Sequence, residues 1–275
     1  MSMTSLQFFK YSATGNDFLV LDLRKNKFFA EVPRHQWVKQ ICHRRFGIGA
    51  DGVVVLESDA KVDFAWDFYN SDGSQAEMCG NAARCVALHM QQIENLKELT
   101  FRTRAGLIET KFFSEDNIQV KMSLPSNERW NQIENLSAQQ VRYDYVIAGV
   151  PHAIVRVPTF KDVASLKDLA RILKAQPIFG PQSTNVTFIR ERSNQNIQIV
   201  TFERGVENLT LSCGTGAVAA AYSLLRGEND KEIYVQVPGG KLKVVFKKNV
   251  PYLIGPAQFV AELKLNQRYF SKEKR

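Results

Sequence analysis

The chain repeats itself at a fixed offset, and this duplication limits the folds open to it more than any other feature. Two segments rich in small residues, Met78–Arg84 and Ser212–Val218, each contain a cysteine followed by a glycine, and the cysteines lie 213 − 79 = 134 positions apart. The same offset aligns Gly15 with Gly149, Phe68 with Phe202, Gly106 with Gly240 and Asp51 with Asn185. A duplicated chain is expected to fold as two similar halves about a pseudo-twofold axis. Two thiols at equivalent positions would then face each other across one cleft.

The length and composition are those of an ordinary globular protein. At 275 residues, the chain is long enough for two domains that each bury a core. Its hydrophobic content of 44% and charged content of 23% argue against disorder. No apolar run approaches the roughly 20 residues that span a bilayer, and Met1–Phe9 lacks the pattern of a secretory signal. We therefore expect a cytoplasmic protein with no membrane partner.

The net charge of +8 raises nucleic-acid binding as an alternative class. The basic residues are scattered, however, and their densest cluster is the tail, Lys272–Arg275. The sequence has no recognisable recognition helix, so we expect a solvated basic surface and no nucleic-acid partner. A nucleic-acid-binding protein would instead bind duplex or single strands in a salt-sensitive manner.

The four cysteines do not form a metal-binding pattern. There is no C-x-x-C pair, and Cys79 and Cys85 are not at zinc-finger spacing. Without a secretory signal, thiols are expected to stay reduced. Cys42 and Cys85 lie in apolar helical patterns and are expected to be buried small hydrophobic residues. For Cys79 and Cys213, a regulatory disulfide is the alternative to a catalytic role.

Each half is predicted to hold short strands around one very apolar helix. The expected strands are 6–9, 18–23, 53–56, 64–69, 99–103, 107–113 and 118–122, then 143–147, 153–157, 187–190, 197–202, 233–237, 242–247 and 258–265. The expected helices are 33–46, 80–93, 165–174 and 216–226.

These elements predict an α/β (α+β) fold of two pseudo-symmetric domains, each a curved mixed β-sheet or barrel wrapped around a central buried helix. The N-terminal domain is expected to comprise residues 1–124 with 259–275, and the C-terminal domain residues 125–258. The last strand has no partner within the repeat and is predicted to return to the first half. The polar segment 125–139 is predicted to be a hinge, and the active site is expected in the cleft between the domains.

The two cysteine–glycine pairs have the chemistry needed to move a proton across a carbon atom. A helix N-terminus favours the thiolate form of a cysteine, and its N–H groups bind carboxylates. The N–H groups in question belong to Gly80, Asn81, Gly214 and Thr215. An amino acid gripped there would have its α-carbon between two sulfurs. One thiolate would remove the α-proton while the opposite thiol protonates the other face, and the carboxylate hydrogen bonds would strengthen as charge develops.

Further polar residues are expected beside this cleft. Three are asparagines, namely Asn16, Asn70 and Asn185. Glu203 and Arg204 stand side by side at a predicted strand end, where they would grip the ammonium and carboxylate of a second amino-acid centre. His152 follows a Gly-Val-Pro sequence and is a candidate for tuning a nearby thiol.

Together these segments resemble the diaminopimelate epimerase family. The segments that carry the resemblance are 10–18, 47–52, 69–74, 77–85, 149–152, 202–205 and 212–217. The resemblance implies a cofactor-independent isomerase that interconverts LL- and meso-2,6-diaminopimelate in lysine and peptidoglycan biosynthesis. It implies a small-molecule amino-acid substrate, no pyridoxal phosphate and no metal, and it suggests a homodimer as one assembly.

Carried over position by position, the resemblance implies that Cys79 and Cys213 are the acid/base thiols, adjusted by His152 and Glu203. The residues implied to bind the reacting carboxylate are Gly80, Asn81, Gly214 and Thr215, and those implied to hold the rest of the substrate are Asn16, Asn70, Asn185, Glu203 and Arg204. Two positions depart from the family pattern: Val150 replaces a common asparagine, and Gly52 replaces a glutamine of some members. A racemase of another amino acid on the same fold is therefore the alternative function.

Overall fold

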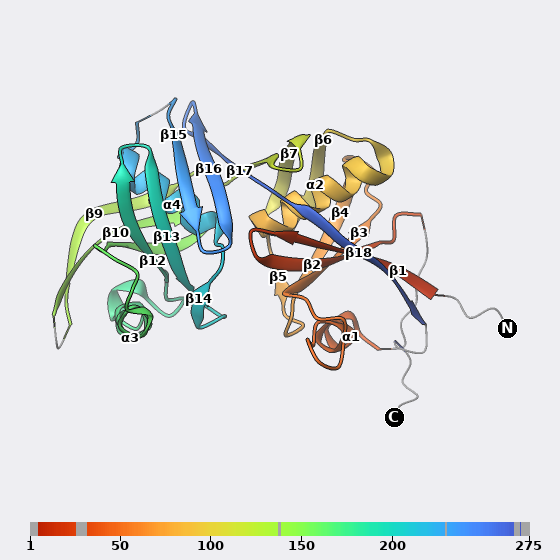
Figure 1. Cartoon of the computed structure of the whole chain (residues 1–275), viewed down its shortest axis with the longest axis horizontal. Helices are drawn as coiled ribbons and strands as arrows, with labels where there is room; N and C mark the ends of the chain where they lie inside the picture. Colours follow the sequence, from red (N-terminus) through yellow and green to blue (C-terminus); the bar gives the residue numbers. More distant parts are fainter. Residues whose placement is uncertain (1–4, 26–31, 137–138, 229, 267–269, 271–275) are drawn as a thin grey trace. The chain divides into compact units, whose positions relative to one another are not determined.

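The computed structural model describes residues 5–25, 32–136, 139–228, 230–266 and 270 (Figure 1). The chain divides into two compact units, of which unit 1 comprises residues up to 120 and from 256 onward, and unit 2 comprises residues 121–255. The basic tail noted in the sequence, Lys272–Arg275, lies outside the described residues. None of the described helices has the length and apolar character that a membrane crossing requires.

Unit 1 is a mixed sheet with two helices. Its strands are β1 (Ser5–Ala13), β2 (Asn16–Asp22), β3 (Gly52–Glu57), β4 (Phe64–Asn70), β5 (Gln75–Ala76), β6 (Glu98–Thr103), β7 (Gly106–Ser114), β8 (Asn117–Lys121) and β18 (Gln258–Asn266), and its helices are α1 (Arg34–Ile41) and α2 (Gly80–Glu94). β1 lies between β18 and β2 and is antiparallel to both. The sheet continues through β3, β4, β6, β7 and β8, with parallel pairing at β2–β3 and β4–β6. The last strand therefore returns to the first half of the chain, as predicted.

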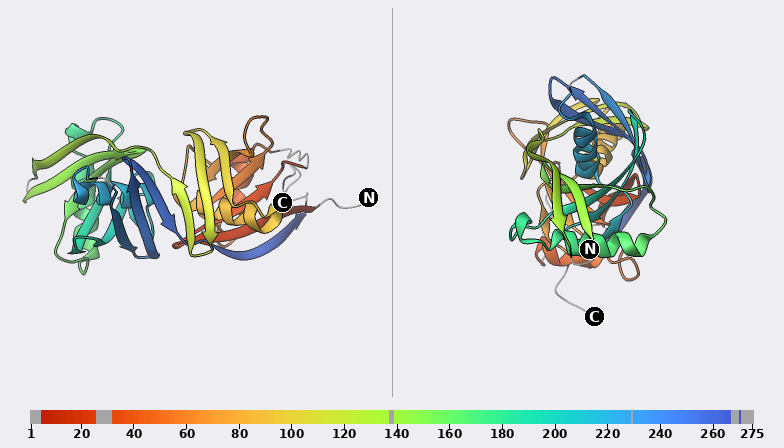
Figure 2. Two further views of the ribbon diagram at one scale, coloured as in Figure 1. Left: turned by 90° about the horizontal axis from the view of Figure 1, so that it is seen from above. Right: turned by 90° about the vertical axis from the view of Figure 1, so that its left-hand side faces the viewer.

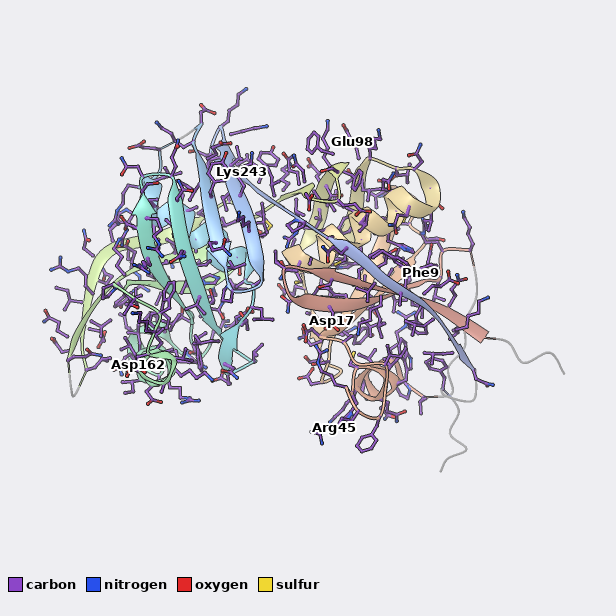
Figure 3. All side chains as sticks on the ribbon, in the orientation of Figure 1. Phe9, Asp17, Arg45, Glu98, Asp162 and Lys243 are labelled. Carbon is purple, nitrogen blue, oxygen red and sulfur yellow. The ribbon has the colours of Figure 1, made fainter. Side chains whose placement is uncertain are left out.

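Unit 2 repeats this order of elements. Its strands are β9 (Ser126–Asn135), β10 (Gln140–Ala148), β11 (Val150–Arg156), β12 (Asn185–Ser193), β13 (Asn196–Glu203), β14 (Asn208–Thr210), β15 (Glu232–Val237), β16 (Gly240–Lys247) and β17 (Val250–Gly255), and its helices are α3 (Val163–Lys174), the short 3₁₀ helix Pro177–Phe179 and α4 (Gly214–Leu225). β10 lies between β9 and β11, and parallel pairing occurs at β11–β12 and β13–β15. β9 thus has in unit 2 the place that β18 has in unit 1. Asp162, labelled in Figure 3, caps α3 by accepting a hydrogen bond from the backbone N–H of Ser165 at 3.0 Å.

One helix in each unit is enclosed by the strands. Every residue of α2 from Gly80 to Met90 is buried. α4 contacts β10 to β13 and β15 to β17, and strands surround it in Figures 1 and 2. This burial agrees with the composition of the two helices, because small apolar residues predominate in α4 and in the buried turns of α2. The fold class is therefore the predicted one, a mixed sheet wrapped around a central helix in each unit.

Two expected elements differ from the structure. α1 ends at Ile41 and does not reach residue 46, because the N–H groups of Ile48 and Gly49 turn back to the Ile41 carbonyl oxygen at 2.9 and 3.0 Å and close the helix end. The polar segment expected as a hinge forms strand β9 over Ser126–Asn135, antiparallel to β10. A strand with a solvent-exposed face carries polar residues on that face, which explains its composition. Residues 137–138 of the expected hinge lie outside the described residues.

Candidate active site

Cys79 stands immediately before α2 in unit 1. Its backbone is extended (φ −143°, ψ 121°), so that the helix begins at Gly80. The side chain is half-buried and does not cap the helix. The sulfur is therefore next to the first backbone N–H groups and the positive end of the helix dipole. This environment favours the thiolate form of cysteine.

A directed chain of side-chain amides lies at this helix start. Arg84 Nη2 donates to Asn81 Oδ1 at 2.7 Å, and Asn81 Nδ2 donates to Asn16 Oδ1 at 2.5 Å. Asn16 Nδ2 in turn donates to Asp51 Oδ2 at 3.0 Å. Each amide accepts through its oxygen and donates through its nitrogen, so the orientation of both amide groups is fixed. The order runs from a buried guanidinium to a half-exposed carboxylate.

Asp51 and Asp17 share one cation, Arg44, at the open end of this chain, and Asp17 also pairs with Lys10. Arg44 Nη2 donates to both carboxylates at 2.7 Å, and Lys10 Nζ lies 2.9 Å from Asp17, which is labelled in Figure 3. Burial alone would raise the pKa of Asp17, but the hydrogen bonds from Arg44 and Lys10 outweigh it, and the pKa is lowered overall. Asp17 therefore stays ionised near neutral pH.

Asn70 lies at the end of β4, in the turn that leads to β5. Its side chain is exposed and its Nδ2 donates to Ser74 Oγ at 3.1 Å. Its partner in β3 is Gly52. A Cβ at residue 52 would lie 2.6 Å from the Tyr69 carbonyl oxygen and 2.8 Å from a ring carbon of Phe68. The glycine at this position is therefore required by the packing of β3 against β4.

Cys213 has the equivalent position before α4 in unit 2. Its backbone is extended (φ −126°, ψ 109°), the helix begins at Gly214, and the residue is only 7% exposed. Its Sγ lies 3.4 Å from Thr215 Oγ1. The two central helices thus begin in the same way, but the polar groups beside the two sulfurs differ.

His152, on β11, connects the start of α4 to two buried threonines. Its Nε2 lies 3.0 Å from Thr215 Oγ1 and its Nδ1 lies 2.9 Å from Thr187 Oγ1, which is 3.1 Å from Thr201 Oγ1. Burial, assisted by the positive charge of Arg204, lowers the pKa of His152 to about 3. The imidazole is therefore neutral at physiological pH.

The neighbours of His152 determine which ring nitrogen carries the hydrogen. Asn185 Oδ1 accepts from the Arg204 backbone N–H at 2.8 Å, which leaves Asn185 Nδ2 facing His152 Nε2 at 3.5 Å. An amide nitrogen only donates, so Nε2 is an acceptor and Nδ1 carries the hydrogen. Thr215 then gives its hydroxyl hydrogen to Nε2, and its oxygen accepts from the Cys213 thiol. The hydrogen bonds run in one direction, from Cys213 through Thr215 to His152.

Glu203 and Arg204 lie together at the end of β13. Thr210 Oγ1 donates to Glu203 Oε1 at 2.5 Å, and Arg204 Nη1 donates to the Gln182 carbonyl oxygen at 2.6 Å. The pair offers a carboxylate and an exposed guanidinium side by side. Val150 begins β11, is half-buried, and carries no polar atom in its side chain.

The site residues predicted from the sequence are divided between the two units. In unit 1, Gly80 and Asn81 follow Cys79, Asn16 contacts Asn81, and Asn70 ends β4. In unit 2, Gly214 and Thr215 follow Cys213, His152 contacts Thr215 and Asn185, and Glu203 and Arg204 lie at the end of β13. Four further polar residues at these helix starts were not predicted, namely Asp51, Arg84, Thr187 and Thr201. Arg84 had a readable signal, because it is a charged residue in the apolar first turns of α2. The threonines look in sequence like any other strand residues.

The described residues include all four cysteines, and no disulfide joins them. Within the same part of the chain, no group of three histidine, cysteine, aspartate or glutamate side chains is placed to hold a metal ion.

Solved structures share this fold. A hydroxyproline epimerase from Agrobacterium vitis superposes with a TM-score of 0.72 at 16% identity and covers 95% of this chain and 92% of its own. A phenazine biosynthesis protein of the PhzF family from Bacillus anthracis gives a TM-score of 0.71 at 15% identity, over 96% of this chain and 99% of its own. The chain therefore belongs to the fold class that these two proteins share.

Sequence comparison narrows this class to one family. The model of the diaminopimelate epimerase family matches residues 8–127 and 145–260. A diaminopimelate epimerase from Flavobacterium psychrophilum is 34% identical over 268 residues, covering 94% of this chain and 99% of the relative. Another, from Methanocella arvoryzae, is 36% identical over 277 residues, with 94% and 96% covered. The chain belongs to the diaminopimelate epimerase family, as its motifs predicted.

Proposed function

We propose that this protein converts LL-2,6-diaminopimelate to meso-2,6-diaminopimelate, a step of lysine and peptidoglycan biosynthesis, with Cys79 and Cys213 as the two acid/base groups. The observation that carries the proposal is the matched placement of the two cysteines, each extended and directly before a buried helix. Membership of the diaminopimelate epimerase family supports the choice of substrate.

The proposed reaction uses one cysteine of each unit. The thiolate of one cysteine takes the α-proton, and the electron pair of the broken C–H bond moves into the substrate carboxylate. The thiol of the other cysteine then delivers its proton to the opposite face, so that the two sulfurs exchange protonation states. Backbone N–H groups at the two helix starts, those of Gly80, Asn81, Gly214 and Thr215, hold the carboxylate as negative charge develops.

The remaining polar residues are proposed to hold the distal amino-acid centre. Glu203 would accept from the distal ammonium, and Arg204 would donate to the distal carboxylate. Asn16, Asn70 and Asn185 would complete the contacts. His152 and Glu203 are proposed to adjust the acidity of the thiols, His152 through its hydrogen bond with Thr215.

Deuterium wash-in tests the proposal directly. Incubation with LL-diaminopimelate in heavy water should place deuterium at one α-carbon and form the meso isomer. Replacing either Cys79 or Cys213 with alanine should lower the rate of meso formation by about 10²–10⁴-fold, the usual contribution of a positioned acid or base. Cys42→Ala is the matched control, because that thiol is buried elsewhere in unit 1 and should leave activity in place. Absence of exchange by the folded wild-type protein would refute the function.

A racemase of another amino acid remains a second candidate, because Val150 offers no polar contact at the start of β11. A substrate panel separates the two functions: faster exchange with a single-centre amino acid than with diaminopimelate would favour the racemase. We also propose a cytoplasmic location and a homodimer, and sedimentation at several protein concentrations tests the latter.

A further inference from the structure

The polar groups behind the two cysteines break the symmetry of the repeat. The counterpart of Arg84 in α4 is Val218, at 218 − 84 = 134 positions, and the counterpart of His152 in β2 is Phe18, at 152 − 18 = 134 positions. A cation is therefore present behind one helix start, and a neutral imidazole behind the other. The two thiols do not have the same electrostatic surroundings.

Arg84 is fully buried, and its hydrogen-bond partners are neutral oxygens. It donates to Asn81 Oδ1 at 2.7 Å, to Thr14 Oγ1 at 3.1 Å, and to the carbonyl oxygens of Pro256 and Gly80 at 3.2 and 3.3 Å. Burial lowers the pKa of Arg84 to about 10, so the guanidinium is still charged at neutral pH. Its bond to the Gly80 carbonyl holds this charge one peptide unit from Cys79.

Other charged or titratable groups near this helix start do not cancel the Arg84 charge. Burial raises the pKa of the Cys85 thiol, so that thiol is neutral. The carboxylates that approach from other elements, those of Asp17 and Asp51, are paired with Arg44 and Lys10. Among the described residues, no carboxylate lies within ion-pair distance of Arg84. A thiolate at Cys79 would be stabilised by this buried cation.

The surroundings of Cys213 favour the opposite protonation state. The directed chain from Cys213 through Thr215 to the neutral His152 uses the S–H hydrogen as its first donor. β13 adds one carboxylate and one guanidinium, on Glu203 and Arg204, whose charges oppose each other. The thiol form of Cys213 therefore satisfies the hydrogen bonds of this pocket.

We propose that Arg84 is a positioning residue that makes Cys79 the resting thiolate, whereas the Thr215–His152 chain keeps Cys213 a thiol. The inference deepens the proposed function and rests on it for its catalytic meaning. In the empty enzyme, Cys79 is the base and Cys213 is the acid for the first proton transfer. Each turnover exchanges these states, and the buried charge of Arg84 favours their return.

Site-resolved alkylation tests this assignment without substrate. The protein is treated briefly with iodoacetamide from pH 5 to 10, and the modification of each cysteine is quantified by peptide mass spectrometry. The plateau rate depends on access to the sulfur, but the pH midpoint reports the thiolate fraction. In the wild type, the midpoint of Cys79 should lie at least about one pH unit below that of Cys213.

Variants at Arg84 separate charge from packing. Arg84→Met should raise the Cys79 midpoint by about one pH unit or more and leave the Cys213 midpoint in place, whereas Arg84→Lys should largely retain the wild-type value. Arg156→Met is the control, because this exposed arginine of unit 2 pairs with Asp144 and should shift neither midpoint. If Arg84→Met does not fold, the inference is tested by the order of the Cys79 and Cys213 midpoints in the wild type and by the Cys79 midpoint of Arg84→Lys.

Two results would overturn the inference: wild-type midpoints that coincide or lie in the reverse order, or a folded Arg84→Met protein with an unchanged Cys79 midpoint. The proposed function fails separately. Deuterium exchange with coincident midpoints would refute only the role of Arg84, and separated midpoints without exchange would refute only the epimerase activity.

Discussion

Replacing Gly216 with alanine is expected to lower kcat/KM substantially and to change the free energy of unfolding only slightly. Gly216 is the third residue of α4, and a Cβ there would lie 2.7 Å from Thr201 Oγ1, 3.1 Å from Thr187 Oγ1 and 3.3 Å from the Cβ of Cys213. Threonine is stiff at χ1, so its hydroxyl has little room to move away. The added methyl group must displace the threonine pair beneath His152, or Cys213 itself.

The expected magnitudes follow from two opposing effects. Alanine is the better helix former by about 1 kcal/mol, and overpacking a well-filled interior costs about 1–3 kcal/mol. The free energy of unfolding should therefore fall by about 0–2 kcal/mol. Displacing an acid/base group by a fraction of an ångström should lower kcat/KM by about 10–100-fold, which a loss of stability of this size does not explain.

The assay combines deuterium wash-in with urea unfolding of the same preparation. Ala82→Gly is the matched control, because Ala82 is the repeat counterpart of Gly216 in α2. The free energy of unfolding of this variant should fall by about 1 kcal/mol, and most of its activity should remain. A Gly216→Ala protein that is more stable than the wild type and fully active would show that the threonine pair does not position Cys213.

Two further predictions concern stability. Burial lowers the pKa of His89 to about 4 and that of His152 to about 3, from 6.5, so between pH 6.5 and 4 the unfolded chain binds protons that the folded chain does not. Above pH 6.5 these histidines should not reduce the free energy of unfolding. As the pH is lowered below 6.5, this free energy should fall by up to about 1.4 kcal/mol per pH unit for each histidine. Urea midpoints that stay constant from pH 7 to 5 would contradict this. Asp144 is buried and accepts from Arg156 and Arg226 at 2.8 and 3.0 Å, so Asp144→Asn should lower the free energy of unfolding by roughly 3 kcal/mol, and an unchanged urea midpoint would count against this pairing.

The elements that could be predicted are those whose sequence pattern matches their surroundings. The buried turns of α2 and nearly all of α4 are rich in small apolar residues, a composition typical of an enclosed helix. α2 begins at Gly80, as expected, whereas α4 was expected from residue 216 and begins two residues earlier, at Gly214. By contrast, β9 was missed because its polar residues face solvent and resemble a linker. β17 was missed as well, although every second residue along it is buried, because Pro251 and Gly255 suggest a turn.

The motifs predict individual residues of the candidate site, but not the hydrogen bonds between them. The motifs single out Asn16, Asn81 and His152 as polar residues near the cysteines. They do not show that Asn81 accepts a hydrogen bond from Arg84, or that His152 is hydrogen-bonded to Thr187. Such contacts join strands and helices that are distant in sequence, and the direction of each hydrogen bond depends on the neighbour beyond it.

The pairing of β1 with β18 affects the order in which the chain matures during its synthesis. β1 can pair at once with β2, but its other neighbour, β18, leaves the ribosome about 245 residues later, which at roughly 5–20 residues per second is some tens of seconds. Unit 2 is contiguous in sequence and is available complete before that point. The half translated second is therefore the one able to fold first, and one edge of the earliest strand stays unpaired until β18 has been made.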